Sequence, residues 1–543
     1  MKTIFTFFLA IIFSVVQGQT ITFQKTYHID STTVFNQVTP LTAGGYIACG
    51  SALQHYLVVK MDQNGQVLWS KQIGDAINTQ TGYRIGEMIG GGYYLLGVID
   101  STVNGDGVIN LLKLDASGNT IWNRIYVVHD VDDLKYPSIR QIANGDFIIS
   151  ANYTNGNTLG EYYMITKTDS NGNVLWSTSV AQTSFDKSIC YDIEESYNHN
   201  AYTAVGDGYY DGLYVVSCDV NGNLLWAKKY EDGNYSSFAG YTVAKTNDDG
   251  YIISTNADVA FKPMLVKLDS LGTFQWSKSY VNPSVTGAFV GNTSVSKTTD
   301  GGFILASLNA PTYPFTTAYP YLIKTNNSGN IQWAKYYTLG KDVNSTFPYI
   351  LVKQTSDKGY VIAANSYSTG SGTSGWVIKT DSLGKTACNY SVVTLMDSII
   401  VLNTTIPSIT GPSVTANVTT YTTANVTVIY PLSCIYTSTT STDTTHTDTT
   451  IVTTRILTQI MGNKKISIFP NPSSGQFIIQ KGDMKINEIE IYNMQGEKIN
   501  EIGVQQKEGQ MKITFDISTQ SKGIYILKIA GEDGVSYSRL VLQ

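Results

Sequence analysis

Short segments in which hydrophobic and polar residues alternate recur along most of the chain, and this pattern predicts β-strands rather than helices. Residues 83–126 show it clearly, because they contain the runs "YRIGEMI", "YYLLGVI", "VINLLKL" and "TIWNRIY". The segments "GGG" and "DASGN" follow the first and the third run. Glycine and aspartate in such positions favour tight turns. We therefore predict four antiparallel strands and two tight turns within this unit.

The unit returns along the chain. The phrase "MDQNGQVLWSKQIG", residues 61–74, has close relatives in "LDASGNTIWNRIY", "TDSNGNVLWSTSV", "CDVNGNLLWAKKY", "LDSLGTFQWSKSY" and "TNNSGNIQWAKYY". Their Trp residues recur about every 50 residues, the length of a four-stranded β-propeller blade. Upstream segments such as "GGGYYLLGV" and "DKGYVIAAN" mark seven sets of the first three strands. The Trp residues are Trp69, Trp122, Trp176, Trp226, Trp276 and Trp333.

Each part of the phrase has an expected structural role. The Asp should cap the turn with its carboxylate, the Gly should adopt the left-handed conformation, and the Trp should fill the gap between adjacent blades. The spacing of the Asp residues does not supply enough oxygens for a calcium site. A Lys precedes the turn in six units. These lysines fit a binding ring or a solvated strand flank, and we expect the solvated flank. These residues are Lys60, Lys113, Lys167, Lys267, Lys324 and Lys379.

The seventh set lacks its own fourth strand. After "TDSLGKTAC" the Trp position is occupied by Cys388, and no matching strand continues. Near the N-terminus, Phe23-Gln24-Lys25-Thr26-Tyr27 stands where Trp-Ser-Lys-x-Tyr stands elsewhere. We therefore predict an all-β fold in which residues 19–388 form a seven-bladed β-propeller. The strand Ile21–His28 closes it by pairing with the strand Trp376–Thr380, so that no long edge stays open.

The N-terminus and the overall charge indicate export. Residues 1–18 contain Lys2, an apolar run and the small-residue site Val16-Gln17-Gly18, as in a secretory signal peptide. The chain of 543 residues has a formal net charge of −6 and only 14% charged residues. No segment is strongly basic, so a nucleic-acid partner is not expected. No further apolar run is long enough to predict a membrane span.

The residues after the predicted propeller change in composition. Residues 389–434 alternate Thr, Val and Asn, which predicts a small β appendage. Cys388 and Cys434 bracket it, and we expect a disulfide between them, because an exported protein passes through an oxidising compartment. Cys190 and Cys218 lie on strands that should not be adjacent, so we do not pair them. Residues 435–465 are rich in Thr and predict a linker.

The last segment, residues 466–543, predicts a compact β-sandwich of the immunoglobulin-like kind. It contains "ISIFPNPSSGQFIIQ", "IYNMQGEKI" and "GIYILKI". It closely resembles the type A C-terminal sorting domain of the type IX secretion system. The motif residues are Pro470, Asn471, Pro472, Gly475, Gly496 and Gly523. The resemblance implies export through the periplasm to the surface or the medium, with the type IX machinery as a partner and with later removal of the sorting domain.

No catalytic motif was found. The five His residues share no metal-ligand spacing, and no nucleophile or phosphate-binding motif appears, so we predict no metal and no cofactor. The acidic segment around His129, Asp130, Asp132 and Asp133 fits a solvated loop or a carboxylate site. Two functions stay open, a binding or adhesion module and an enzyme that degrades a polysaccharide or a protein.

Any ligand should bind the face formed by the long connections, which carry many aromatic residues. Functional residues concentrate on variable loops that a rigid scaffold holds in place. Tyrosine offers a flat apolar face with a polar tip for stacking on a sugar ring or on a protein partner. The same tyrosines fit ordinary loop positions, because the chain contains 37 of them. The candidate ligand-binding residues are Tyr153, Tyr209, Tyr210, Tyr235 and Tyr313.

Overall fold

The computed structural model divides into two compact units, residues 1–440 and residues 441–543, and each unit is described separately. Within the first, it describes residues 21–386 apart from 30–31, 76–77, 101–106, 128–130, 156–160, 183–188, 208–211, 232–238, 258–261, 282–287, 311–318, 339–349 and 369–371. It also describes seven strands between residues 390 and 437, and most of 457–542. All regular elements of these described parts are strands. The all-β prediction is therefore confirmed.

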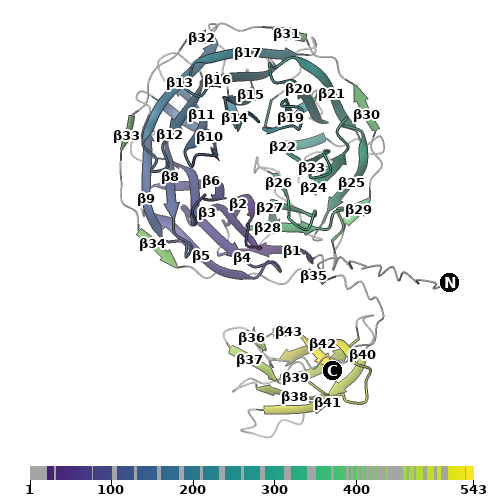
Figure 1. Ribbon diagram of the computed structural model, residues 1–543. Coiled ribbons are helices and arrows are strands. Elements are labelled where there is room, and N and C mark those ends of the chain that lie inside the picture. The colour runs from purple at the N-terminus through teal and green to yellow at the C-terminus, as the bar shows by residue number, and fades with distance from the viewer. Residues whose placement is uncertain are drawn as a thin grey trace, which may run out of the picture. The chain divides into compact units, whose positions relative to one another are not determined.

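Seven antiparallel sheets, which we number in chain order, surround a common centre in the described part of the first unit (Figure 1). Sheet 1 contains β2 (Val34–Pro40), β3 (Tyr46–Ala52), β4 (His55–Met61) and β5 (Val67–Gly74). Sheet 2 contains β6 (Thr79–Glu87), β7 (Tyr93–Asp100), β8 (Gly107–Leu114) and β9 (Thr120–Val127). Sheet 3 contains β10 (Val131–Gln141), β11 (Phe147–Asn155), β12 (Glu161–Thr168) and β13 (Val174–Gln182). The first strand of each sheet lies nearest the centre (Figure 1).

The remaining sheets follow the same order. Sheet 4 contains β14 (Ile189–Glu195), β15 (Ala201–Asp207), β16 (Leu213–Asp219) and β17 (Leu224–Glu231). Sheet 5 contains β18 (Thr242–Lys245), β19 (Tyr251–Ala257), β20 (Lys262–Leu268) and β21 (Phe274–Val281). Sheet 6 contains β22 (Ala288–Lys297), β23 (Phe303–Ala310), β24 (Tyr319–Thr325) and β25 (Ile331–Tyr337). Sheet 7 contains β26 (Leu351–Gln354), β27 (Tyr360–Ser368), β28 (Gly372–Thr380) and the N-terminal β1 (Ile21–Tyr27).

The N-terminal strand β1 pairs with β28, in the register Phe23 opposite Lys379 and Tyr27 opposite Gly375. The predicted pairing of these two distant segments is therefore observed. Inner hydrogen bonds also join sheet 7 to sheet 1, because the Asn365 side chain accepts from Phe35 N at 2.7 Å and donates to Phe35 O at 2.9 Å.

The repeated phrase forms a contact between successive sheets. Asp62 Oδ1 accepts from the backbone N–H groups of Asn64 and Gln66 at 2.8 Å each, so the Asp caps the turn as predicted. Gly118, in the equivalent turn of sheet 2, has φ +80°, and a Cβ there would lie 2.6 Å from the ring of Trp69 in sheet 1. Trp69 also packs at 5.9 Å from the ring of Tyr93. The Trp therefore fills the gap between adjacent sheets, as expected.

The segment predicted as a small appendage does not form one. Its strands lie on the outer edges of the seven sheets, one strand per sheet, and complete a circuit around the unit (Figure 1). We call these seven strands the belt. It contacts sheets 6, 5, 4, 3, 2, 1 and 7 in that order, against the direction of the chain within the ring. The belt strands are β29 (Tyr390–Val392), β30 (Met396–Ile399), β31 (Asn403–Thr405), β32 (Ile409–Thr410), β33 (Thr415–Asn417), β34 (Thr422–Asn425) and β35 (Cys434–Thr437).

The Lys residues before the turn are only partly as predicted. The side chains of Lys267, Lys324 and Lys379 are 5%, 4% and 1% exposed, so the expectation of solvated flanks is wrong for them. Each forms an ion pair of 2.8–2.9 Å with an Asp in the first tight turn of its own sheet. Lys60 and Lys167 instead lie 5.6 Å from the ring centroids of Tyr93 and Tyr202 in the next sheet.

The second unit consists of two four-stranded sheets that share one hydrophobic core, which includes Ile468, Phe477, Ile489 and Leu527. The strand β36 falls within the range predicted as linker and pairs with β37. The first sheet contains β36 (Leu457–Met461), β37 (Lys464–Phe469), β38 (Gln476–Gln480) and β41 (Lys512–Asp516). The second contains β39 (Ile486–Tyr492), β40 (Lys498–Ile502), β42 (Gly523–Gly531) and β43 (Gly534–Leu542).

Candidate functional site

Hydrogen bonds between neighbouring sheets hold the innermost strands of the first unit in place. In several sheets a polar side chain of the innermost strand accepts a hydrogen bond from a backbone N–H group on the innermost strand of the next sheet. The pairs are Gln37 with Ile85 at 3.1 Å, Asp192 with Val243 at 3.1 Å, Thr242 with Val295 at 2.7 Å and Ser294 with Val352 at 3.0 Å. Such bonds satisfy buried backbone groups that have no strand partner on the inner side.

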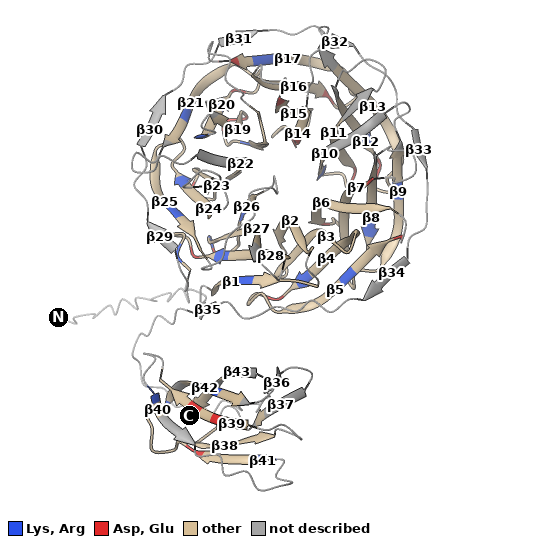
Figure 2. Ribbon diagram, turned by 180° about the vertical axis from the view of Figure 1, so that it is seen from behind, with Lys and Arg blue, Asp and Glu red and all other residues tan. Residues whose placement is uncertain are grey.

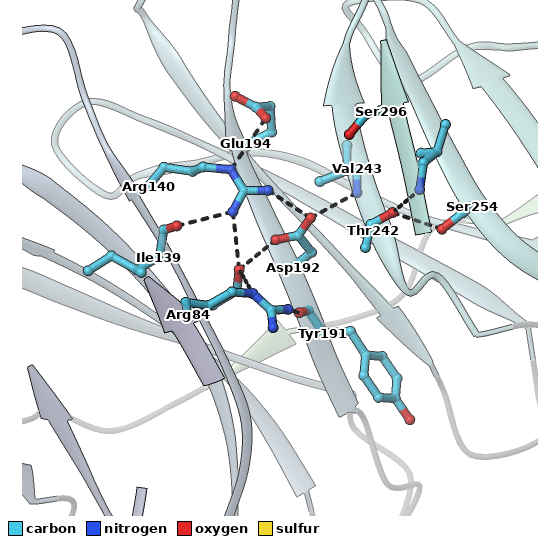
Figure 3. Close-up of polar contacts among 12 residues, drawn as sticks. Arg84, Ile139, Arg140, Tyr191, Asp192, Glu194, Thr242, Val243, Ser254 and Ser296 are labelled. Carbon is cyan, nitrogen blue, oxygen red and sulfur yellow. Dashed lines mark hydrogen bonds and ion pairs between the residues drawn. The ribbon is translucent and has the colours of Figure 1, made fainter. Parts of the chain in front are cut away.

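In sheets 2, 3 and 4, charged side chains take part in these hydrogen bonds between neighbouring innermost strands. Charged residues appear as short bands within largely uncharged strands (Figure 2). The charged side chains around Asp192 form the densest polar network in the described part of the centre. Asp192 of β14 lies at its middle (Figure 3). Its carboxylate accepts from Ser138 Oγ at 2.5 Å, from Arg140 Nη2 at 2.9 Å and from Val243 N at 3.1 Å.

Two arginines lie near this carboxylate on the side of sheets 2 and 3, and only Arg140 bonds to it directly. Arg84 of β6 donates through Nε to Ser138 Oγ at 3.3 Å and through Nη2 to the carbonyl oxygen of Tyr191 at 3.4 Å. Arg140 of β10 donates through Nη1 to the backbone oxygen of Ile139 at 3.1 Å. Burial alone would raise the pKa of Asp192, but Arg140 and Arg84 outweigh it and lower that pKa. Asp192 is therefore a fully paired structural anion at neutral pH.

Glu194 and Lys353 are less completely paired than Asp192. Glu194 Oε2 lies 3.5 Å from Arg140 Nε, and its side chain is 16% exposed. Burial raises the pKa of Glu194 above its ordinary value, although Arg140 opposes the shift. Lys353 of β26, on sheet 7, is partly buried, and burial lowers its pKa to about 8, with Arg140 acting in the same direction. These two groups can therefore exchange protons or bind polar ligands closer to neutral pH than exposed residues would.

The described residues contain no group of three or more His, Cys, Asp or Glu side chains that could hold a metal ion. The cysteines Cys49, Cys190 and Cys218 are buried and free, which agrees with leaving Cys190 and Cys218 unpaired. Burial raises the pKa of the Cys190 thiol to about 12, so this residue is a poor nucleophile.

The predicted ligand-binding tyrosines lie outside the described residues. This applies to Tyr209, Tyr210, Tyr235 and Tyr313, and for Tyr153 only the backbone is described, within β11. The side chains of the acidic segment at residues 129–133 also lie outside the description. The structure therefore does not bring these candidates together with the inner cluster.

Of the other residues singled out in the sequence, some lie within the described residues and some lie outside them. Cys388 and the side chain of Cys434 lie outside the described residues, and so do Pro470, Asn471, Pro472, Gly496 and residues 1–20. Gly475 and Gly523 are described, the first directly before β38 and the second as the first residue of β42. Gly475 has φ +140°, and a Cβ there would lie 2.3 Å from Ser518. Only glycine fits at this point of the C-terminal unit without a shift of its neighbours.

The sequence analysis did not identify the inner cluster, although the spacing of its residues indicates it. Arg84, Ser138 and Asp192 are separated by 54 residues at each step. This separation is one repeat of the chain, so the three residues occupy the same position on successive innermost strands. A search for polar residues at equivalent positions of the repeat would have found them.

Comparisons with known proteins identify the C-terminal unit. Residues 467–543 match the family described as secretion system C-terminal sorting domain. The protein is therefore an exported all-β protein that carries a sorting domain at its C-terminus. It is a cargo of the type IX secretion system, and it is secreted or held at the outer surface of the cell. Among the described residues, no helix is both long and apolar enough to cross a membrane.

The rest of the chain has only distant likenesses. A sequence search among curated proteins finds no match. One similar solved structure is a protein of unknown function from Dyadobacter fermentans, with 8% identity, 55% of this chain and 93% of that chain covered, and a TM-score of 0.37. Another is the polysaccharide lyase Uly1, which is 9% identical in sequence. The match covers 65% of this chain and 91% of that chain, with a TM-score of 0.37. A third is an exo-beta-1,3-galactanase from Phanerochaete chrysosporium, which is 11% identical in sequence. The match covers 74% of this chain and 99% of that chain, with a TM-score of 0.27. At these scores the likenesses support no functional argument.

Proposed function

We propose that the first unit is a binding module of the cell surface, built as a seven-bladed β-propeller that the N-terminal strand closes. The observation that carries this proposal is the combination of a rigid inner ring with long connections on one side. Several innermost strands are fixed to the innermost strand of the next sheet by side-chain hydrogen bonds, as in the contact of Thr242 with Val295 N at 2.7 Å. Variable loops on such a scaffold are typical positions for ligand contacts.

The remaining boundaries complete the proposal. Residues 1–18 are a signal peptide, residues 19–388 the propeller core with the belt on its rim, and residues 466–543 a type A sorting domain with an immunoglobulin-like sandwich. The Thr-rich residues between the belt and β36 act as the linker. The ligand is a surface polysaccharide or a protein, contacted by the tyrosines of the long connections.

Retention on immobilised polysaccharides and surface proteins tests the binding proposal. The exported chain should be retained by at least one of them. Changing Tyr209 and Tyr210 to Ala should weaken retention, whereas Leu68→Ala, in an exposed position on the outer strand of sheet 1, should not. Equal loss from both changes, or none from the Tyr pair, argues against a site on the long connections.

The second candidate is a secreted enzyme that degrades a polysaccharide or a protein. Glu194 and Lys353 favour it, because their pKa values are shifted toward neutrality in a common site, as in general acid and base catalysis. The same ligand panel separates the two candidates. Release of soluble products, abolished by Glu194→Gln, supports the enzyme, and retention without products supports the binding module.

A further inference from the structure

Lys353, Glu194 and Arg140 occupy equivalent positions on three innermost strands. Each lies two residues before a tight turn, which begins at Thr355, Ser196 and Ile142 respectively. All seven turns of this kind connect the first strand of a sheet to its second strand, so they lie on one side of the ring. The three charged side chains are therefore near the mouth of the centre on the tight-turn side, opposite the long connections.

The equivalent residues of the other four sheets are short. They are Thr39, Gly86, Ala244 and Ser296. Two of them already use their hydroxyl groups, since Thr39 Oγ1 donates to Ile85 O at 2.8 Å and Ser296 Oγ donates to Val352 O at 2.7 Å. Long charged side chains at this level thus come only from sheets 3, 4 and 7 within the described part of the ring.

Lys353 has no charged partner of its own among the described side chains. The described groups that act on its ammonium group are the cations Arg140 and Arg84 and the carboxylates of Asp192 and Glu194. Arg140 is committed to both carboxylates, to Ser138 Oγ and to the Ile139 carbonyl. Lys353 interacts electrostatically with the two arginines and the two carboxylates, but within the described residues no hydrogen bond or ion pair holds its ammonium group. Within the described residues, Lys353 is therefore an unpaired cation on a protein whose net charge is −6.

We propose that the tight-turn mouth of the ring binds an oxyanion, a carboxylate or a sulfate group, through the ammonium group of Lys353. Arg84 and Arg140 strengthen the site by their positive field, and Glu194 weakens it by its negative charge. An ammonium group with free N–H donors beside fixed arginines is suited to bind such a group. The site lies on the face opposite the long connections, so it does not depend on the binding module proposed above.

The groups that face Lys353 predict how binding changes with pH. They are Arg84, Arg140, Asp192 and Glu194, with Lys245 near Glu194 and Tyr94 near the arginines. The arginines stay charged and Asp192 stays ionised near neutrality. Binding should be strongest at acidic pH, where Glu194 is protonated, and weaken as Glu194 ionises. It should be lost as the pH rises through about 8, where Lys353 loses its proton.

Calorimetric titration of the purified chain, residues 19–543, with sodium sulfate and with sodium glucuronate tests the proposal. Chloride serves to keep the ionic strength constant, since exposed charges are screened by salt. Lys353→Met should weaken binding by about 10-fold or more, because a hydrogen bond to a charged group contributes roughly 1.5–3 kcal/mol. Glu194→Gln should strengthen binding, because it removes the opposing charge and keeps a polar group beside Arg140.

The matched control is Lys385→Gln, which removes a positive charge from an exposed turn residue of sheet 7 and should leave binding unchanged. Circular dichroism and thermal unfolding establish that each variant is folded. Preference for sulfate or for glucuronate identifies the group that the site takes, and either supports the proposal. It is overturned if the unaltered chain binds neither anion, if Lys353→Met binds as well as the unaltered chain, or if Glu194→Gln weakens binding.

Discussion

The hydroxyl group of Tyr27 donates a hydrogen bond of 2.8 Å to the carbonyl oxygen of Gly65. Tyr27 ends the N-terminal strand in sheet 7, and Gly65 lies in the turn before the outer strand of sheet 1. The same bond joins Tyr126 to Gly172 and Tyr337 to Gly384, each at 2.8 Å between successive sheets. The N-terminal strand thus forms, where the two ends of the ring meet, the contact that successive sheets make elsewhere.

Phe23 completes this contact, and its truncation should destabilise the first unit. Its ring is fully buried, packs 5.8 Å from the ring of Tyr46, and takes the place of the Trp in the other sheets. Phe23→Ala should lower the free energy of unfolding by about 3–5 kcal/mol, the usual cost of removing a buried aromatic ring. Urea denaturation measures this loss. Leu68→Ala, at a position that is 60% exposed, is the control and should change little. A small effect of Phe23→Ala would contradict its role in the closure.

The pairing of β1 with β28 could be predicted because the phrase itself is informative. Aligning Phe23 with the Trp residues and Tyr27 with the Tyr that follows fixes the register without any structure. Turn chemistry was equally predictable, since an Asp followed by a Gly at the left-handed position has few alternatives. Local chemistry of this kind requires only a few adjacent residues.

The belt could not be predicted in the same way. Its strands have two to four residues and pair with strands far away in the sequence, whereas consecutive strands are usually neighbours. A weak signal exists, because the strands begin at Tyr390, Met396, Asn403, Ile409, Thr415 and Thr422, six or seven residues apart. An extended chain of that length spans roughly 20–25 Å, a suitable step between the outer edges of neighbouring sheets.

Removing the belt should expose the outer strands and destabilise the ring. A chain that ends at residue 386 leaves β5, β9 and their equivalents with an unpaired edge, which promotes association between molecules. Its free energy of unfolding should be at least about 3 kcal/mol lower, because several backbone hydrogen bonds of roughly 0.5–1.5 kcal/mol each are lost. Urea denaturation and light scattering measure both effects. A chain that ends at residue 440 retains the belt and is the control. Equal stability and solubility of the two chains would argue against this role.

The predicted Cys388–Cys434 disulfide would fasten the start of the belt to its end. Gln24 of β1 lies opposite Cys434 in the strand register, and its Nε2 atom donates at 3.1 Å to Thr386 Oγ1, two residues before Cys388. We expect the exported, denatured chain to have three reactive thiols, those of Cys49, Cys190 and Cys218. Titration with a thiol reagent counts them. Replacing both Cys388 and Cys434 by Ser should leave this count unchanged, and five thiols in the unaltered chain would contradict the bridge.

Deleting residues 466–543 should stop export at the periplasm, because the type IX machinery recognises the sorting domain. The truncated chain should still fold, since the first unit has its own cores. Fractionation of the native host, with detection of the first unit, measures where the chain accumulates. The full-length chain with Leu68→Ala provides a control for expression and should reach the surface. Normal surface delivery of the truncated chain would disprove the role of this unit in sorting.

The buried Lys379–Asp357 pair predicts which of two substitutions destabilises the protein more. Lys379 is 1% exposed and Asp357 is 30% exposed, so removing the carboxylate leaves a buried ammonium group with little compensation. Asp357→Asn should therefore cost about 3 kcal/mol or more, and Lys379→Met, which inserts an apolar side chain of similar length, should cost clearly less. Urea denaturation of both variants gives the order. A larger loss for Lys379→Met would show that the ion pair itself, rather than the burial of the lysine, dominates.

The equivalent pair in sheet 6 sets the response to acid. Burial alone would raise the pKa of Asp300, but hydrogen bonds from Thr298 and Lys324 outweigh it and lower the pKa to about 2. A carboxyl group whose pKa is lower in the folded state stabilises the fold above the unfolded pKa, about 4, and this stabilisation is lost as the pH falls from about 4 to about 2. Asp300→Asn should therefore be less stable than the unaltered chain at pH 7, and the difference should shrink toward pH 2. Urea denaturation at both pH values measures the two differences, and a difference that stays constant with pH would contradict the shifted carboxyl group.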